Sequence, residues 1–445
     1  MNLEQLKNYD GTCIIEENKT FSYPDLVQNV AKYQTEISSK INKGDVVCIQ
    51  SDYSFDSISL FLALLQASCI VVPIVPTTDA EFDLKLKAAF INKIITINDE
   101  GLQISNINFE GETPENYTQI IEKNNSGLVL FSSGTTGVPK VMVHNLTELA
   151  ESLKPPKKIR NLNFLLFLLF DHIGGINTLL NCLNNGSAIT IPANRNPEYI
   201  LQIIQDKKVQ ILPTSPTFLN LMLMTENFSS YNLSSLKMIT YGTERMPQTL
   251  LDKLKLKIPT VKFLQTFGTS ETGILKTESK SSTSLFFKIV DEDYQFKIEN
   301  DQLFLKSKNQ VKGYLNQESD QFLDEGWFAT GDLVETDGDG YMKVVGRMNK
   351  IINAGGLKVL PKEVEDVILQ VENVIDATVF SRDNAITGQM VCAEVVINEN
   401  SDKAEMKKLI FEKCRQDLDK YKIPSKLIIT NTLAVSNRFK KGNIT

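Results

Sequence analysis

An apolar run followed by a loop of glycine and hydroxyl residues constrains this chain most. Residues 128–131, Leu-Val-Leu-Phe, are typical of a short buried strand. The next nine positions hold four hydroxyl residues, two glycines and a lysine, in the order Ser132, Ser133, Gly134, Thr135, Thr136, Gly137, Val138, Pro139 and Lys140. Glycines permit a bend that exposes consecutive backbone N–H groups, and the hydroxyls and lysine add donors and positive charge. The stretch therefore predicts a strand that ends in a polyphosphate-binding loop.

A hairpin turn with a solvated lysine is the alternative for such a loop. It is not a Walker A loop, because the pattern Gly-x-x-x-x-Gly-Lys-Ser/Thr does not occur in it. As an ordered string, however, residues 131–140 resemble the phosphate loop of the adenylate-forming superfamily, which comprises acyl-CoA synthetases, adenylation domains and luciferases. The chain as a whole looks most similar to the acyl- or aryl-CoA ligases of that superfamily.

Composition and charge narrow the class of protein. The 445 residues suffice for about three domains, and 42% apolar with 23% charged residues is ordinary for a globular protein. The net charge of −7 and the lack of a basic block argue against nucleic acid or an anionic membrane as a main partner. The start has no signal-peptide pattern, and no apolar run reaches the roughly 18 residues of a membrane span. The six cysteines form no Cys-x-x-Cys pair, so we expect buried, reduced thiols in a cytoplasmic protein.

Strand and helix patterns alternate through the first 125 residues. Residues 46–49 and 69–74 are typical of buried strands, while residues 55–66 have the spacing of a helix. Such alternation predicts a parallel sheet covered by helices, in which ligands bind at the carboxyl ends of the strands. The apolar run at residues 164–170 predicts a further buried strand.

The pattern changes at residue 284. Residues 284–345 contain short alternating runs, which predict the hairpins of a small antiparallel β subdomain. Residues 350–445 alternate strand and helix patterns again. We therefore predict an α/β fold with a large N-terminal domain of helix-covered sheets over residues 1–346, which includes the β subdomain. A hinge at residues 347–349 leads to a small, mobile α+β lid over residues 350–445.

A histidine followed by two glycines comes after the apolar run, in the string Asp171, His172, Ile173, Gly174 and Gly175. An imidazole at the end of a strand is well placed to line a pocket, although a satisfied core or surface histidine is the alternative. The string resembles the family segment that borders the acyl substrate, which implies a pocket-lining, catalytic role for His172. The predicted acid pocket suggests an apolar or aromatic acid. It consists of Phe170, His172, Ile176, Tyr241, Thr243 and Ile274.

Two other polar residues near these motifs have less specific interpretations. His144 follows the phosphate loop and is interpreted as structural. Amino-acid-activating members of the superfamily carry an aspartate near the position of Asp171, where it pairs with the substrate ammonium. The histidine and glycines that follow Asp171 resemble the acyl-CoA synthetase version instead.

Residues 267–272 form another polar string after a predicted strand. Its aromatic residue could stack on a base, and its carboxylate with neighbouring hydroxyls suits Mg²⁺, which prefers hard oxygen ligands. A strand-end turn with a solvated glutamate is the alternative. The string resembles the family motif aromatic-Gly-x-Thr-Glu, which implies that Phe267 stacks on adenine, Ser270 contacts the phosphates and Glu271 holds the metal. Other nucleotide contacts implied by the resemblance are Gly268, Thr269 and the turn of Gly242, Thr243 and Glu244, which is shared with the acyl group.

Two strings near the predicted hinge extend the resemblance. Residues 326–333 resemble the ribose-binding string, in which the Asp332 carboxylate can accept hydrogen bonds from both ribose hydroxyls. Residues 346–359 resemble the hinge and the glycine loop that follows it. Arg347 can reach ribose or phosphate with its fork of donors, and Asn349 occupies the pivot. The thiol channel would be faced by Gly355 and Gly356.

The last string, residues 433–443, departs most from the family. Members usually end in Pro-x-Thr-x-x-Gly-Lys, where this chain has alanine, serine and phenylalanine in place of the proline, threonine and glycine. The alignment puts Lys440 at the catalytic position. Lys441 is the rival, and a solvated basic tail is the alternative.

Together the resemblances imply ATP-dependent activation of an organic carboxylic acid. An acyl-adenylate would form with release of pyrophosphate, and the acyl group would then pass to a thiol, with CoA favoured. ATP, Mg²⁺ and CoA are the implied cofactors. Two other functions stay open: an acyl-adenylate donor to a separate acyl carrier protein, and a non-catalytic nucleotide-binding relative.

Overall fold

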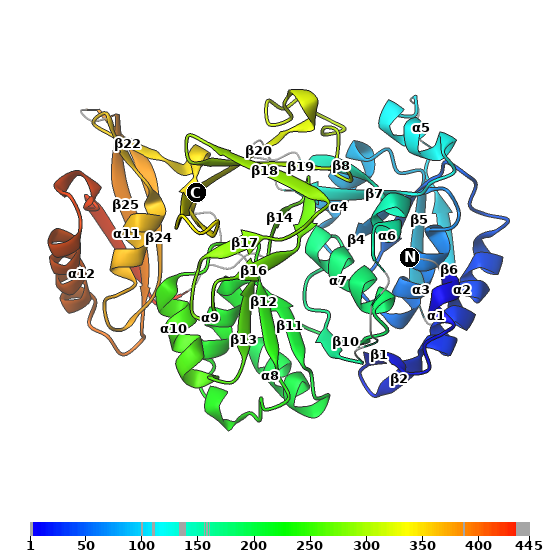
Figure 1. The fold of residues 1–445 in the computed structure, drawn as a ribbon, viewed down its shortest axis with the longest axis horizontal. Helices are drawn as coiled ribbons and strands as arrows, with labels where there is room; N and C mark the ends of the chain where they lie inside the picture. Colours follow the sequence, from blue (N-terminus) through cyan, green and yellow to red (C-terminus); the bar gives the residue numbers. More distant parts are fainter. Residues whose placement is uncertain are drawn as a thin grey trace.

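The computed structural model describes residues 3–98, 101–108, 112–132, 139–154, 156, 159, 161–385 and 388–432. These residues form two helix-covered sheets, an antiparallel sheet beside them and a smaller domain at the C-terminal end (Figure 1). The arrangement confirms the predicted α/β class, with its antiparallel β subdomain and its small C-terminal domain.

The first sheet contains the strand that precedes the predicted phosphate loop. Its order is β6-β5-β3-β4-β7-β8, with β3, β4, β5 and β7 parallel and β6 and β8 antiparallel at the edges. Alternate residues face opposite cores: Val47 and Ile49 join a core shared with the second sheet, while Val46 and Cys48 face α4 and α5. The elements are α1 (Leu3–Leu6), α2 (Tyr23–Ile37), β3 (Val46–Gln50), α3 (Phe55–Leu64), β4 (Ile70–Ile74), α4 (Asp79–Ala88), β5 (Lys93–Asn98), β6 (Gly101–Asn106), α5 (Glu115–Glu122), β7 (Gly127–Ser132), β8 (Lys140–Asn145) and α6 (Leu146–Glu151).

The second sheet has the order β13-β12-β11-β9-β10-β1-β2 and is parallel except for β2. Helices α8, α9 and α10 cover one face of it, where Leu201, Phe218 and Leu251 pack against Leu212 and Phe263. The elements are β1 (Thr12–Glu16), β2 (Lys19–Ser22), β9 (Asn163–Leu165), α7 (Ile173–Asn184), β10 (Ala188–Ile191), α8 (Pro197–Asp206), β11 (Ile211–Thr214), α9 (Pro216–Met224), η1 (Phe228–Ser230), β12 (Met238–Tyr241), α10 (Gln248–Lys257) and β13 (Lys262–Gln265).

An antiparallel sheet, β16-β17-β21-β20-β19-β18, follows a short hairpin of β14 and β15. It runs from Thr277 to Arg347 and contains the region predicted at residues 284–345. The elements are β14 (Phe267–Thr269), β15 (Gly273–Leu275), β16 (Thr277–Ser279), β17 (Phe287–Ile289), β18 (Tyr294–Glu299), β19 (Gln302–Ser307), η2 (Asp324–Gly326), β20 (Phe328–Thr336) and β21 (Met342–Arg347).

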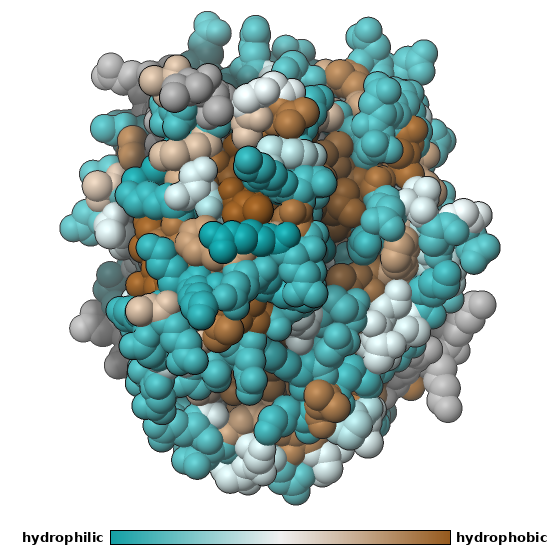
Figure 2. Space-filling model, turned by 90° about the vertical axis from the view of Figure 1, so that its left-hand side faces the viewer, coloured by the Kyte–Doolittle hydropathy of each residue, from teal (hydrophilic) through white to brown (hydrophobic). Residues whose placement is uncertain are grey.

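The C-terminal domain is a five-stranded sheet with its own core. Helix α11 begins at a proline, whose missing N–H costs nothing at that position, and its Val364 and Ile368 pack on the sheet. The outer face of this domain, on the left-hand side of Figure 1, is mostly hydrophilic (Figure 2). The elements are η3 (Met348–Lys350), β22 (Ile352–Ala354), β23 (Leu357–Val359), α11 (Pro361–Ile368), β24 (Val374–Asn384), β25 (Gly388–Ile397), α12 (Lys403–Asp417), η4 (Lys420–Lys422) and β26 (Lys426–Thr430).

The expectation of one long strand at residues 164–170 is wrong. Strand β9 ends at Leu165, and the apolar side chains that follow fill cores instead of extending the ladder. Phe167 packs in the core beneath α8–α10, whereas Phe170 packs in the core between the two sheets. A continuous apolar run cannot by itself distinguish a strand from a segment that turns between two cores.

The cysteines and helices agree with the other expectations. All six cysteines are buried and free of disulfides. Within the described part of the chain, no helix is both long and apolar enough to cross a bilayer.

We predict that Gly175→Ala destabilises the protein by about 1–3 kcal/mol, the cost of overpacking. Gly175 lies in the first turn of α7, and a Cβ there would stand 2.2 Å from the Leu169 carbonyl oxygen and 2.8 Å from the Tyr53 hydroxyl. Urea unfolding measures the change. Gly313→Ala is the matched control, because its Cβ would meet nothing within 4 Å. Equal stability of the two variants would contradict the packing described here.

Candidate active site

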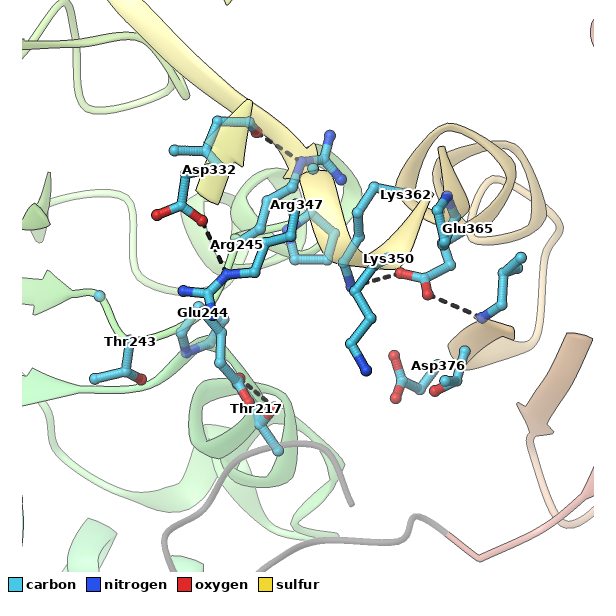
Figure 3. Close-up of a pocket in the computed structure, with 18 of the residues that line it drawn as sticks. Thr217, Thr243, Glu244, Arg245, Asp332, Arg347, Lys350, Lys362, Glu365 and Asp376 are labelled. Carbon is cyan, nitrogen blue, oxygen red and sulfur yellow. Dashed lines mark hydrogen bonds and ion pairs between the residues drawn. The ribbon is translucent and has the colours of Figure 1, made fainter. Parts of the chain in front are cut away.

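A cavity of about 1050 Å³ is lined by residues of the first-sheet region, the second-sheet region, the antiparallel sheet and the C-terminal domain; Figure 3 shows part of this lining. Thr217, Thr243 and Glu244 reach it from the second sheet, Asp332 and Arg347 from the antiparallel sheet. Lys350, Lys362, Glu365 and Asp376 reach it from the C-terminal side. The predicted nucleotide-binding residues that line this cavity are Ser132, Gly242, Thr243, Glu244, Phe267, Gly268, Ser270, Asp332 and Arg347.

The parallel strands β11, β12 and β13 deliver the first group. Their last residues Thr214, Tyr241 and Gln265 lie side by side in register, so the segments that follow leave the sheet at one level. Glu244 accepts hydrogen bonds from the hydroxyl of Thr217 (2.5 Å) and from its backbone N–H (3.3 Å). The segments after β12 and β13 also approach closely, and this contact requires glycine at 242, because a Cβ there would lie 2.5 Å from the Thr266 hydroxyl oxygen.

Phe267 stands at the start of β14 with its ring half-buried at the cavity. The ring stacks on Phe287 with centroids 5.5 Å apart and planes 23° from parallel. This packing fixes an aromatic plane beside the turn of Gly242. Gly268 allows the hairpin to close, since a Cβ there would meet the Gly273 carbonyl oxygen at 2.3 Å.

Asp332 and Arg347 are paired residues of the antiparallel strands β20 and β21. Arg347 Nε donates to Asp332 Oδ1 over 2.9 Å, and Arg347 stays exposed while Asp332 is buried. Burial raises the pKa of the Asp332 carboxyl, and the guanidinium of Arg347 opposes that rise. The pair places a carboxylate and a fork of N–H donors together at the cavity.

His172 lines the cavity as the N-cap of α7. Its Nδ1 accepts the backbone N–H of Gly174 over 3.0 Å, which fixes the orientation of the ring. Lys85 of α4 also lines the cavity, although its side chain is only 3% exposed. Its Nζ lies 2.8 Å from Glu81 Oε1 and 3.9 Å from Asp171 Oδ2. No sequence motif predicted a role for this lysine.

The predicted acid pocket is only partly assembled at this cavity. His172 and Thr243 line it. Phe170, Ile176 and Tyr241 do not, because they are packed in cores; the ring of Phe170 lies against those of Tyr53 and Phe61. The remaining member of the predicted set packs partly buried against the core between the sheets and is Ile274.

The predicted metal ligand and the loop lysine both contact Tyr314. Glu271, Thr269 and Lys140 are not among the lining residues. The hydroxyl of Tyr314 donates to Glu271 Oε1 over 2.7 Å, and Lys140 Nζ lies 4.5 Å from the centre of the Tyr314 ring. Outside the described residues lie Ser133, Gly134, Thr135, Thr136, Gly137, Lys440 and Lys441.

An ion pair joins the C-terminal domain to Arg245, a residue that lines the cavity. Both terminal nitrogens of Arg245 bind the carboxylate of Asp366 on α11, and Arg245 Nε donates to the Val344 carbonyl oxygen over 3.1 Å. Asn349, the predicted pivot, lines the cavity. The predicted thiol-channel residues do not: Gly355 and Gly356 are exposed at the turn between β22 and β23.

His144 lies beside the polar string at residues 267–272, which contains Glu271. It lies in β8, is buried, and faces the backbone of Ser270 and Asn309. Burial lowers its pKa from 6.5 to about 4, and those backbone groups partly oppose the shift. The ring is therefore neutral near pH 7, as suits the structural interpretation.

Comparisons with known proteins agree on one family. The family described as AMP-binding enzyme matches residues 4–302, and the family described as AMP-binding enzyme C-terminal domain matches residues 363–440. The chain is 29% identical to 4-coumarate-CoA ligase 1 of Narcissus pseudonarcissus over 315 residues, which cover 63% of this chain but only 57% of that protein. It is 25% identical to 2-succinylbenzoate–CoA ligase of Enterococcus faecalis over 380 residues, which are 79% of this chain and 77% of that protein.

Solved structures share the fold. An anthranilate CoA ligase in complex with anthranoyl-AMP superposes with a TM-score of 0.81 at 17% identity, covering 99% of this chain and 95% of that one. The o-succinylbenzoate CoA synthetase of Bacillus subtilis, in complex with its acyl-adenylate intermediate, gives 0.76 at 20% identity, with 99% and 96% covered.

We predict that His144 makes stability pH-dependent between pH 6.5 and 4. The unfolded chain binds a proton near pH 6.5, whereas the folded chain binds it only near pH 4, so stability falls as the pH falls through this window. Between pH 7 and 4.5 the wild-type chain should lose about 2.5 kcal/mol more free energy of unfolding than His144→Gln. Urea unfolding at both pH values measures the difference, and an equal loss in the two proteins would contradict it.

Proposed function

This chain belongs to the AMP-binding enzyme family, and we propose that it activates an organic carboxylic acid with ATP and passes the acyl group to CoA. The observation that carries this proposal is the cavity itself. An aromatic plane at Phe267, the Asp332–Arg347 pair and the turn at Gly242 converge there. The names of the relatives, which are CoA ligases of aryl acids, support the same direction.

In the first step an oxygen of the substrate carboxylate bonds to the α-phosphorus of ATP, and the bond to pyrophosphate breaks. No general base is needed, since a carboxylic acid is already ionised near neutral pH. The work left to the protein is positioning and the balance of charge. Phe267 stacks on adenine, Asp332 accepts the ribose hydroxyls, and Arg347 donates to ribose or phosphate. His172 and Thr243 border the acid.

A magnesium ion fits the residues around Glu271. The carboxylate has one oxygen engaged by Tyr314 and a second that can bind a cation. Mg²⁺ commonly takes one or two protein carboxylates together with water and phosphate oxygens. When bound, it would neutralise charge on the departing pyrophosphate. Ser270 and the loop at residues 132–140 would hold the phosphates alongside it.

The acceptor step requires a different position of the C-terminal domain. Gly355 and Gly356 lie away from the cavity, so they can face a thiol channel only after a rotation, for which Asn349 is the proposed pivot. Such a rotation would break the Arg245–Asp366 ion pair. CoA is favoured over a carrier protein because of the His172 segment and the relatives' names. The non-catalytic alternative would be excluded by measurable turnover.

Exchange of pyrophosphate into ATP, across aryl, short-chain and long-chain acids and amino acids, tests the function. Exchange followed by a CoA thioester establishes the ligase and identifies the class of acid. Exchange without a thioester points to a carrier protein as acceptor. If no acid supports exchange while ATP binds, the non-catalytic alternative replaces our proposal.

We predict that Lys440→Ala lowers the rate of adenylation by about 10²-fold or more, as expected when a group that stabilises developing charge is lost. Pyrophosphate exchange with the best acid measures the rate. Lys441→Ala is the matched control and should retain exchange. The opposite result, with exchange lost only in Lys441→Ala, would assign the role to Lys441, and full exchange in both variants would remove it from this tail.

A further inference from the structure

We propose that Tyr314 is a positioning residue, which holds the Glu271 carboxylate for the nucleotide's divalent cation and holds Lys140 at the end of the phosphate loop. This inference rests on the proposed function, because it concerns the same ATP. The Glu271 carboxylate and the Lys140 ammonium come from separate segments of the chain, so a shared partner would fix the two charges relative to each other. Tyr314 contacts both.

The first contact is a hydrogen bond to a carboxylate. The Tyr314 hydroxyl donates to Glu271 Oε1 over 2.7 Å and lies 3.3 Å from Gln321 Oε1. A hydroxyl has one proton, and the shorter, charged acceptor is the stronger partner. Burial raises the pKa of Tyr314, and the negative charge of Glu271 raises it further, so the hydroxyl keeps its proton. The bond fixes the plane of the carboxylate and leaves Oε2 for a cation.

The second contact is with the lysine. Lys140 Nζ lies 4.5 Å from the centre of the Tyr314 ring, within the range of a cation–π interaction. Tyr314 as a whole residue is 8% exposed, so the ammonium sits beside a tyrosine that is largely withdrawn from water. One side chain thereby sets the positions of a carboxylate and an ammonium that both belong at the phosphates of ATP.

The segment that carries Tyr314 is itself fastened on both sides. The Asn316 side chain donates to the Pro139 carbonyl oxygen over 2.8 Å and accepts the Val141 N–H over 3.0 Å, so it brackets Lys140. The backbone N–H of Val311 donates to the carbonyl oxygen of Glu271 over 2.9 Å. Neighbours of Tyr314 thus bind backbone groups on both sides of Lys140 and at Glu271. None of these contacts depends on the Tyr314 hydroxyl.

Tyr314→Phe isolates the hydroxyl, because it keeps the ring beneath Lys140. In the full-length chain, Mg²⁺ is titrated while binding of a non-hydrolysable ATP analogue is followed by calorimetry. We expect the Mg²⁺ concentration for half-maximal binding to rise about 10-fold or more, as for other partners of metal ligands. Binding of the analogue without Mg²⁺ should be unchanged. Tyr231→Phe, a substitution away from the cavity, is the matched control and should behave as wild type.

A double-mutant cycle separates positioning from a general loss of structure. If Tyr314 acts through Glu271, Tyr314→Phe should change the Mg²⁺ dependence little in a Glu271→Gln background. Equal effects in both backgrounds, or an unchanged Mg²⁺ dependence in a Tyr314→Phe protein with wild-type melting temperature, would overturn the inference. Failure of the wild-type chain to bind the analogue would instead overturn the proposed function, on which the inference rests.

Discussion

The parallel pairing of β11, β12 and β13 is the constraint on which the rest of the site depends. Because Thr214, Tyr241 and Gln265 lie on one rung, the three segments that follow them leave the sheet together and meet at one edge. Their close approach needs glycine at 242, where a Cβ would strike Thr266. A slip of one residue in this ladder would exchange the core and cavity faces of a whole strand, so the register that builds the core also builds the cavity.

The other walls of the cavity come from other parts of the chain. Asp332 and Arg347 belong to the antiparallel sheet, while Lys350, Lys362 and Asp376 belong to the C-terminal side (Figure 3). Arg245, which follows strand β12 of the second sheet, forms a bidentate ion pair with Asp366 of the C-terminal domain. An ion pair of two partly exposed side chains stabilises modestly. The pair can therefore stabilise one orientation of the C-terminal domain without preventing a second orientation. The two successive steps of the proposed reaction would require two such orientations.

The sequence predicted the strand ends and their motifs well, because each depends on local order. It predicted side-chain direction poorly. Tyr241 and Gly242 are neighbours in one motif, yet the alternation of a strand turns the tyrosine into the core and leaves the next residue at the cavity. Phe170 and Ile176 also pack in the core between the sheets, although Phe170 lies beyond the end of β9 and Ile176 lies in helix α7. No sequence motif predicted a role for Tyr314. Its partner Glu271 is 43 residues away, and only the folded chain brings the two together.

The side chains suited to bind a nucleoside and the charges suited to phosphate transfer are two different sets of residues. The side chains that line the cavity are suited to a nucleoside: an aromatic plane, a buried carboxylate and a guanidinium. The charges suited to phosphate transfer, Glu271 and Lys140, both contact one tyrosine, Tyr314. A charge held by a buried partner loses less orientation when the cavity changes shape than a charge on a free surface does, because its partner moves with it. In the proposed reaction, placing these charges on elements of the N-terminal domain would keep them in place while the C-terminal domain rotates.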